Sequence, residues 1–310
     1  MTSTNITAKV IADSVSQNGD RMTTMEIEYP RFILAELNTH RMLSKNSASS
    51  RAIPVKAMHE QIKASPATPV YWGKNQAGMQ AKEELTGNDL GDAKFIWQRA
   101  MQDSLHWAWA LADRVGLHKQ IANRITEPWM TMKTVISGTE WRNFFWLRAH
   151  ADAQPEIHAL AVTMMGAYSK SVPQELAPGE WHVPYVNTYR DSHTGVLYYL
   201  DNQDKYITAE EARIISASCC AQVSYRKNDD SFEKAKKIYQ QLIESQPCHA
   251  SPVEHQATPI EDSFYETWYD EPQHLRKFGV THSDTDGDLW SGNLRGWIQH
   301  RKLIPNEAQW

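Results

Sequence analysis

The feature that most constrains the fold is a pair of alternating segments near the N-terminus. Residues Ile6–Val15 and Met22–Tyr29 alternate between apolar and polar side chains, which is the pattern of a half-buried β-strand. Asn18-Gly19 lies between them, and this dipeptide is typical of a tight β-hairpin turn. We therefore predict an antiparallel hairpin, against which the later segments have to pack.

The rest of the chain has more helical than strand patterns. A helix is predicted after Pro30, whereas Ser44–Arg51 has the polar composition of a loop or a helix start, and Val196–Leu200 reads as a strand. The overall fold class is therefore α/β or α+β with more helix than strand. Further helices are predicted at Asp92–Ile125 with a break near Gly116, Thr139–His150, Gln154–Ser171, Ala209–Ala221 and Ser231–Ser245.

Composition excludes several classes of protein. The chain has 310 residues and a formal net charge of -5, which does not suit a general binder of nucleic acid polymers. No apolar run approaches the roughly 20 residues of a membrane span, and the N-terminus lacks the layout of a signal peptide. Three Cys residues and no CxxC pair favour neither a disulfide framework nor a zinc site. We expect a cytoplasmic protein that binds no membrane and no metal.

Ring-bearing residues and one long connection are also conspicuous. There are 12 Trp and 13 His residues, which indicate either a large core or a site that stacks on flat heterocycles. Trp72, Trp107, Trp109 and Trp297 are expected to be core residues. The segment Ser65–Asn88 is rich in Pro and Gly, and connections of this length are usually lids, binding loops or insertions.

Two segments carry the polar chemistry of an anion site. Glu36–Arg51 combines Arg, Lys and His with hydroxyl groups, which suits a bound phosphate; an N-cap followed by a solvated basic loop explains the same composition. Arg148 follows Phe144 and Phe145 by three or four residues, so on a helix all three share one face. A guanidinium sheltered in this way needs an anion.

A third segment, Cys248–His255, contains two histidines, a glutamate and a thiol. The spacing matches no metal motif, and Pro252 argues against one helix that presents both His249 and His255. Cys248 beside His249 could form an activated thiol, although sequence neighbours often point apart.

Together these segments resemble motifs of the flavin-dependent thymidylate synthases. Thr39-His40-Arg41 resembles the R-H-R of that family, and Ser49 and Arg51 follow at the family's spacing. The other elements that resemble family motifs are Arg124–Pro128 (R-x-x-L-P), Asn143–Arg148 (N-F-x-x-L-R) with Ala153–Ile157 (A-Q-x-E-I), Ala221–Tyr225 (A-R-x-S-Y), and Ser251–His255 (S/T-P-F-E-H) preceded by His249.

The resemblance implies a thymidylate-synthase-complementing-like fold, helix-rich with a central mixed or antiparallel sheet. In the family the elements like 221–255 precede the R-H-R motif, so their order here resembles a circular permutation, which is tolerated when the termini lie close together. We expect a single catalytic domain over 1–310, with family-like elements at 1–54, 121–171 and 209–256. Residues 55–120 are expected to be an insertion or lid, and 256–310 have little counterpart.

The resemblance also implies an activity. The family transfers a one-carbon unit from methylenetetrahydrofolate to C5 of dUMP to give dTMP, with FAD as cofactor, NADPH as co-substrate, and sites shared within a homotetramer. By position, His40, Arg41, Asn143, His249, Ser251 and Glu254 would bind FAD. Glu36, Ser49, Arg51, Arg124 and Arg148 would bind the nucleotide, and Ser49 and Arg148 are the candidate catalytic residues.

Four departures from the family pattern leave the substrate open. Thr39 stands where the family has Arg, Glu36 where it usually has Gln, Ser47 where it often has Glu, and Gln222 where it has Arg. A carboxylate at position 36 accepts from the amino group of cytosine, which favours dCMP over dUMP if Glu36 faces the base. The alternatives are therefore a dUMP or dCMP hydroxymethylase-type relative, and a non-catalytic relative that only binds nucleotide.

Overall fold

A computed structural model describes residues 6–224, 230–305 and 307–308 of the chain. Its N-terminal part forms the predicted hairpin, in which β1 (Thr7–Ser16) pairs antiparallel with β2 (Arg21–Pro30). Gly19 has a φ of +87°, a left-handed conformation that a residue without a Cβ adopts readily. The apolar alternation therefore predicted both strands correctly.

The hairpin lies inside a five-stranded sheet with the order β3-β4-β2-β1-β5. Its remaining strands are β3 (Ser44–Ser47), β4 (Thr131–Gly138) and β5 (Gln174–Leu176). Only the β1–β5 pair is parallel, so the sheet is mixed, and the predicted mixed α/β class is confirmed. The prediction of a loop or helix start over Ser44–Arg51 was wrong for its first four residues, because Ser44–Ser47 pairs with β4 along the edge of the sheet.

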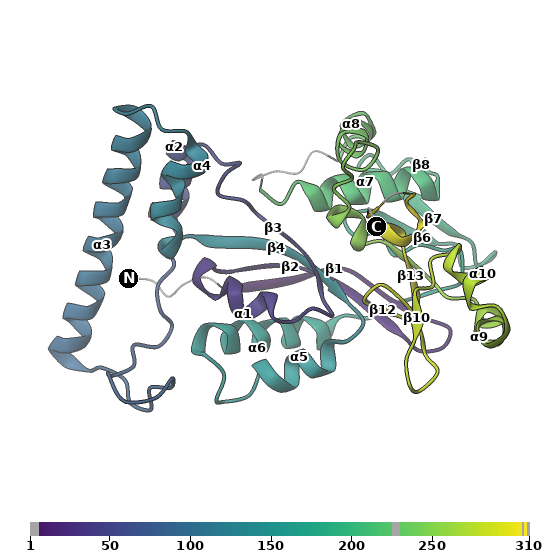
Figure 1. Ribbon diagram of the computed structural model, residues 1–310, viewed down its shortest axis with the longest axis horizontal. Helices are drawn as coiled ribbons and strands as arrows, with labels where there is room; N and C mark the ends of the chain where they lie inside the picture. The colour runs from purple at the N-terminus through teal and green to yellow at the C-terminus, as the bar shows by residue number, and fades with distance from the viewer. Residues whose placement is uncertain (1–5, 225–229, 306, 309–310) are drawn as a thin grey trace.

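Helices cover both faces of this sheet (Figure 1). On one face, Met25, Ile27 and Tyr29 pack under α5 (Trp141–Arg148) and α6 (Pro155–Lys170). These side chains lie two residues apart on β2, so the period of the strand places all three on the same side. On the other face, Val135 of β4 contacts Cys220 of α7 (Ala209–Ala221). The helices predicted at 139–150, 154–171 and 209–221 are thereby confirmed.

The segment before β3 packs into the main core beside α6 through Ile33 and Leu37, and the long segment after β3 gathers at one end of the sheet (Figure 1). Met58, Ile62, Met101, Leu105 and Met130 form a small core of their own there. The elements before β3 are η1 (Arg31–Ile33) and α1 (Leu34–Asn38), and those at the end of the sheet are α2 (Val55–Ala64), α3 (Gly87–Asp113), α4 (Lys119–Ala122) and η2 (Asn123–Trp129).

Two of the expected core tryptophans lie on α3 at the surface. Trp107 is 59% exposed and Trp109 44% exposed, so their assignment to the core was wrong. They are exposed because α3 packs on one side only, through Met101 and Leu105. Trp297 is fully buried, as expected for a core residue.

The C-terminal half forms small sheets and helices at the opposite end of the molecule (Figure 1). No elements were predicted for 256–310, yet this region supplies two helices and most of the short strands. The helices here, besides α7, are α8 (Phe232–Leu242), η3 (Ser251–Glu254), α9 (Asp262–Asp270), α10 (Pro272–Arg276) and η4 (His300–Leu303). The strands are β6 (Asn187–Arg190), β7 (Leu197–Leu200), β8 (Tyr206–Ile207), β9 (Ala257–Pro259), β10 (His282–Ser283), β11 (Leu289–Ser291), β12 (Leu294–Arg295) and β13 (Trp297–Gln299).

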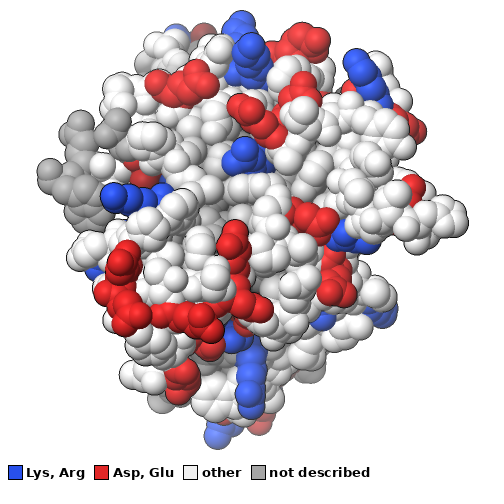
Figure 2. All heavy atoms as spheres, turned by 90° about the vertical axis from the view of Figure 1, so that its right-hand side faces the viewer, with Lys and Arg blue, Asp and Glu red and all other residues white. Residues whose placement is uncertain are grey.

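The surface at the C-terminal end has mixed charge. Lys and Arg side chains on this face are separated by Asp and Glu side chains, with acidic groups gathered in one band (Figure 2). Among the helices of the described residues, none combines the length and the hydrophobicity that crossing a membrane requires.

A chain of buried hydrogen bonds joins the sheet to the C-terminal half. The His182 ring contacts the Ser14 hydroxyl through Nδ1 at 2.9 Å and the Thr24 hydroxyl through Nε2 at 2.8 Å. Thr24 Oγ1 lies 2.6 Å from Ser137 Oγ, which lies 2.8 Å from Nδ1 of His255. Burial lowers the pKa of His182 to about 4 and that of His255 to about 3, so both rings are neutral at pH 7.

These histidines make stability depend on pH. Their pKa values are lower in the folded chain than the ordinary 6.5, so the unfolded chain binds more protons as the pH falls below about 6.5. We expect each ring to remove roughly 1–2 kcal/mol from the free energy of unfolding between pH 7 and pH 5. Denaturant unfolding of the wild type and of His182→Gln at both pH values checks this. The variant should lose less stability on acidification, and an equal loss in the two proteins would contradict the assignment.

Candidate functional site

Strand β3 divides the predicted site residues into two groups. Its four residues extend the chain roughly 10 Å, which is more than one phosphate group spans. Thr39, His40 and Arg148 form a cluster before the strand, which we call the Arg148 cluster. Ser49 lies beyond the other end of the strand, beside a pocket.

In the Arg148 cluster, the guanidinium binds two neutral partners. Arg148 Nε donates to His40 Nε2 at 2.8 Å, and Nη2 donates to Thr39 Oγ1 at 3.1 Å. The ring of Phe144 meets the His40 ring edge-on at 4.9 Å. Among the described residues no carboxylate pairs with Arg148, so the cluster retains a positive charge that suits an anion. The sequence-based expectation that this arginine needs an anion stays a prediction.

The protonation state of His40 follows from the same geometry. Burial, followed by the positive charges of Arg148 and Lys45, lowers the pKa of His40 to about 4. The ring is therefore neutral at pH 7, and its Nε2 carries the lone pair that accepts from Arg148. A protonated ring could not accept this hydrogen bond.

Lys45 stabilises the turn that holds His40. Its Nζ donates to the backbone carbonyls of His40 at 2.5 Å and of Leu43 at 2.8 Å. Burial lowers the pKa of this ammonium to about 8, while the nearby carboxylate of Glu254 acts in the opposite direction. Sequence reasoning missed Lys45, although it lies within the motif-like segment; nothing local shows that its side chain folds back.

Two of the residues predicted to bind cofactor reach β3 from the C-terminal half. Ser251 and Glu254 belong to η3, which packs against β3. Glu254 forms an ion pair with Arg301, and the Arg301 Nε donates to Glu307 at 2.6 Å. The carboxylate of Glu254 is thus held by an arginine 47 residues away, which sequence reasoning also missed.

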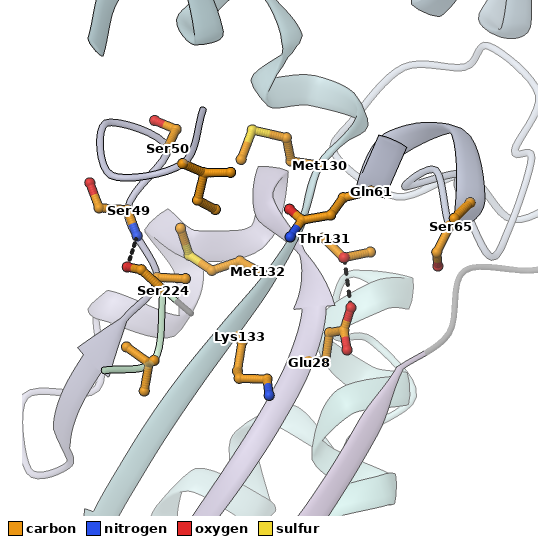
Figure 3. Close-up of a pocket in the computed structure, with 14 residues that line it drawn as sticks. Glu28, Ser49, Ser50, Gln61, Ser65, Met130, Thr131, Met132, Lys133 and Ser224 are labelled. Carbon is orange, nitrogen blue, oxygen red and sulfur yellow. Dashed lines mark hydrogen bonds between the residues drawn. The ribbon is translucent and has the colours of Figure 1, made fainter. Parts of the chain in front are cut away.

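The pocket beside Ser49 lies over the sheet and below α2 (Figure 3). Ser49 donates its backbone N–H to Ser224 Oγ at 2.9 Å, and Thr131 Oγ1 donates to Glu28 Oε1 at 2.7 Å. We call this cavity of about 440 Å³ the Ser49 pocket. It is lined by Glu28, Ala48, Ser49, Ser50, Ile53, Gln61, Ala64, Ser65, Met130, Thr131, Met132, Lys133, Val223 and Ser224.

The lining of the Ser49 pocket combines an apolar wall with many polar groups. Met130 and Met132 lie between Ser49 on one side and Gln61 of α2 on the other (Figure 3). Sites for small organic ligands are usually mostly apolar with a few polar groups that fix orientation. The Ser49 pocket therefore suits a flat molecule that carries hydrogen-bonding edges.

Two arginines contact Glu127, shortly before β4 begins. Glu127 accepts from Arg124 Nη1 at 2.9 Å and from Ser50 Oγ at 2.9 Å, and it pairs with Arg31 at 3.1 Å. One carboxylate thus faces two guanidinium groups, which leaves a net positive charge. Arg51 is exposed, and its side chain makes no ion pair or hydrogen bond within the described residues.

The structure does not bring the remaining predicted residues together around one point. Glu36 is half-buried, and its Oε2 is buried without a hydrogen-bond partner. The exposed predicted residues, whose side chains make no hydrogen bond to other described residues, are Arg41, Asn143, His249 and Ser251.

Two further expectations concern the C-terminal motifs. Burial raises the pKa of the Cys248 thiol, so the idea of an activated thiolate was wrong. In the segment that resembles A-R-x-S-Y, Ser224 contacts Ser49, whereas Tyr225 lies outside the described residues.

Comparison with known proteins identifies the family. The model of the thymidylate synthase complementing protein family, Thy1, matches residues 21–174. These residues include β2, β3 and β4, the Arg148 cluster and Ser49. Through these residues the chain belongs to that family. A search of curated proteins found no match.

Solved structures with partial similarity to this chain were also found. A UMP/dUMP methylase PolB from Streptomyces cacaoi, bound with 5-Br UMP, is 18% identical with a TM-score of 0.44, covering 54% of this chain and 90% of that chain. Thymidylate Synthase X (ThyX) from Helicobacter pylori, with FAD and dUMP, is 18% identical with a TM-score of 0.33, covering 47% of this chain and 67% of that chain.

The neutral state of His40 can be measured directly. We expect the ring to titrate near pH 4 in the wild type and nearer its ordinary 6.5 in Arg148→Gln, because the variant removes a positive charge while burial remains. NMR of protein with labelled histidine, assigned with His40→Asn, follows this titration. A His40 that titrates near pH 6.5 in the wild type would contradict the geometry.

Proposed function

We propose that this protein is a flavin-dependent enzyme that transfers a one-carbon unit from methylenetetrahydrofolate to C5 of a pyrimidine deoxynucleotide monophosphate, converting dUMP to dTMP. Membership of the thymidylate synthase complementing family supports this class of reaction. The single observation that carries the proposal is the half-buried guanidinium of Arg148, which binds neutral partners and lacks a carboxylate. A cation held in this way favours an anionic substrate over a purely structural role.

FAD, whose pyrophosphate is anionic, would be bound by exposed donors on the surface. Arg41, Asn143, His249 and Ser251 are exposed, and their side chains make no hydrogen bond to other described residues, so each is available to a ligand. His40 and Glu254 flank β3 and would complete the set. Bound FAD, recharged by NADPH, would supply the hydride that turns the transferred carbon into a methyl group.

The side chains of this chain would then bind and orient the nucleotide. Ser49 and Arg51 would hold its phosphate at the end of β3, with Arg124 close to them through Glu127. The base would lie in the Ser49 pocket against Met130 and Met132. Arg148 would then stabilise negative charge on the base as the new C–C bond forms, since uracil C5 is only weakly nucleophilic.

A second copy of the chain would complete this site. Arg148 contacts Thr39 and His40 before β3, whereas Ser49 follows the strand, so the two would act on one nucleotide most readily from different copies of the chain. Trp146 is 72% exposed beside Arg148 on α5, with Leu147 also exposed, and adjacent exposed apolar side chains are typical of an interface. We therefore propose a homo-oligomer, a tetramer by family resemblance, in which the Arg148 cluster of one copy faces the Ser49 pocket of another.

We propose a single catalytic domain in which 209–256 contributes to the site in permuted order. The contact between Ser224 and Ser49 and the packing of η3 on β3 support this arrangement. Residues 55–120, which supply α2 above the Ser49 pocket, would act as the insertion or lid. The protein would act in the cytoplasm, without a nucleic acid polymer or membrane partner.

Replacing Arg148 tests the proposed function. Loss of a charged hydrogen-bonding group that contacts the substrate typically costs roughly 1.5–3 kcal/mol, so Arg148→Gln should lower kcat/KM by about tenfold or more. Arg142→Gln is the matched control, because Arg142 is exposed on the same helix and makes no ion pair within the described residues. Release of tritium from 5-tritiated dUMP with FAD, methylenetetrahydrofolate and NADPH provides the assay. Equal activity of the two variants would overturn the role of Arg148.

Glu36 favours a second candidate, in which dCMP is the substrate or the product is a hydroxymethyl nucleotide. Its buried Oε2 lacks a partner, and a carboxylate oxygen accepts from the amino group of cytosine but not from the O4 of uracil. Hydroxymethyl product would form if water rather than hydride captured the methylene intermediate.

Parallel assays with dUMP and dCMP, with products identified by mass spectrometry, distinguish these candidates. If Glu36 reads cytosine, Glu36→Gln should lower kcat/KM for dCMP about tenfold while leaving that for dUMP within about threefold. A wild type that converts dUMP only would rule out the cytosine hypothesis. Flavin absorbance of the purified protein distinguishes both enzyme candidates from a non-catalytic relative. Protein that stays colourless after addition of FAD binds no flavin and is not a flavoenzyme.

A further inference from the structure

A second cavity lies between α2 and α3, outside the site described above. Its volume is about 560 Å³, and we call it the α2–α3 groove. Each helix contributes four side chains at positions i, i+3, i+4 and i+7, so each contributes one continuous face. The groove is lined by Lys56, His59, Glu60 and Lys63 of α2 and by Gln102, Leu105, His106 and Trp109 of α3.

The chemistry of this groove differs from an ordinary helix–helix seam. Facing positions with this spacing normally carry apolar residues that close the gap between two helices. Here Leu105 is the only aliphatic side chain of the lining, and the gap stays open. Lys56 and Lys63 bring two positive charges against the single carboxylate of Glu60, in a chain whose net charge is -5. The groove is therefore electropositive and suits an anion.

His59 adds an imidazole ring to the lining of the groove. The residue is only 8% exposed, and its Nε2 lies beneath the surface without a hydrogen-bond partner. Burial and the nearby Lys63 lower the pKa of His59, so the ring is neutral at pH 7.

Trp109 supplies a flat apolar surface at the same place. Its ring lies 6.2 Å from the His59 ring, and 44% of the residue is exposed. A large indole left open beside basic groups is the arrangement on which nucleic acid bases stack, because every base has a flat aromatic face. Gln102 on the same helix has an amide that hydrogen-bonds to base edges.

We propose that the α2–α3 groove binds a nucleoside monophosphate, with the base on Trp109 and the phosphate between Lys56 and Lys63. Lysines bind phosphate as point charges, whereas planar carboxylates are usually bound by the fork of an arginine, and the lining contains no arginine. The volume falls within the usual range of small-ligand pockets, about 300–1,000 Å³.

The groove is next to the Ser49 pocket but separate from it. Gln61, Ala64 and Ser65 of α2 line the Ser49 pocket, while Lys56, Glu60 and Lys63 line the groove. One helix thus forms a wall of both cavities, and their linings share no residue. The proposal does not depend on the activity assigned to the first site.

Calorimetric titration of the full-length protein with dTMP, and separately with AMP, tests this proposal. We expect AMP to bind in one event, and dTMP to bind in the groove in addition to the proposed active site. The double variant Lys56→Ala/Lys63→Ala should weaken the groove event about tenfold or more, and Trp109→Ala should weaken it about fivefold or more. Lys94→Ala and Trp107→Ala are the matched controls, since both residues are exposed or half-buried on α3 outside the groove, and they should leave binding unchanged.

The outcomes separate this site from the proposed active site. Binding that is weakened by Arg148→Gln but not by the groove variants would place the nucleotide in the first site only and overturn the proposal. Loss of the groove event for dTMP and AMP in the groove variants, with turnover of dUMP retained, would support it. Trp109→Phe keeps a ring and should retain most of the affinity, which distinguishes stacking from loss of folded structure.

Discussion

The buried chain Ser14–His182–Thr24–Ser137–His255 is the constraint on which the rest of the structure depends. The three hydroxyls belong to β1, β2 and β4 of the sheet, while the two histidines come from the C-terminal half. Polar groups inside a protein are stable only when they are paired, so each ring has to meet its hydroxyl partner. The two halves of the chain therefore have one favoured relative position, which hydrophobic packing alone would define less sharply.

The relative position of the two halves also determines the geometry of the candidate site. His255 directly follows Glu254, the last residue of η3, so the hydrogen bond from its ring to Ser137 also places η3 beside β3. From there the carboxylate of Glu254 acts on Lys45, whose ammonium holds the carbonyl of His40. The neutral His40 in turn accepts from Arg148. A structural network inside the sheet is thus linked to the cation that the proposed chemistry needs, through three hydrogen bonds and the electrostatic effect of Glu254 on Lys45.

Local patterns in the sequence predicted the elements whose stability is local. The hairpin has its Asn-Gly turn, α7 has a capping box formed by Thr208 and Glu211, and α6 begins with Pro155 at its first turn. Strands β3 and β4 were missed because neither alternates clearly, and both exist through pairing across more than 80 residues of chain. Ser44–Ser47 has the composition of a loop, yet its backbone groups are satisfied by β4.

In the candidate site, too, the sequence predicted local features but not those that depend on distant partners. Motif spacing made Ser49 and Arg148 candidates but could not show that β3 lies between their segments, because that separation depends on the sheet. Lys45 and Arg301 were missed for a related reason, since their partners lie in a backbone turn and in a distant helix. Trp107 and Trp109 were assigned to the core from composition, whereas α3 leaves one side without a covering element.

The position of α2 links these findings. Met58 and Ile62 anchor it to the small core with α3, and Val55 is the other buried apolar residue of this helix. Helices that pack through so few buried residues open or shift at low cost compared with the central sheet. Because α2 forms a wall of the Ser49 pocket and of the α2–α3 groove, a ligand in either cavity adds contacts to the same weakly held helix. The two cavities therefore share one structural element, and a change in α2 would alter the walls of both.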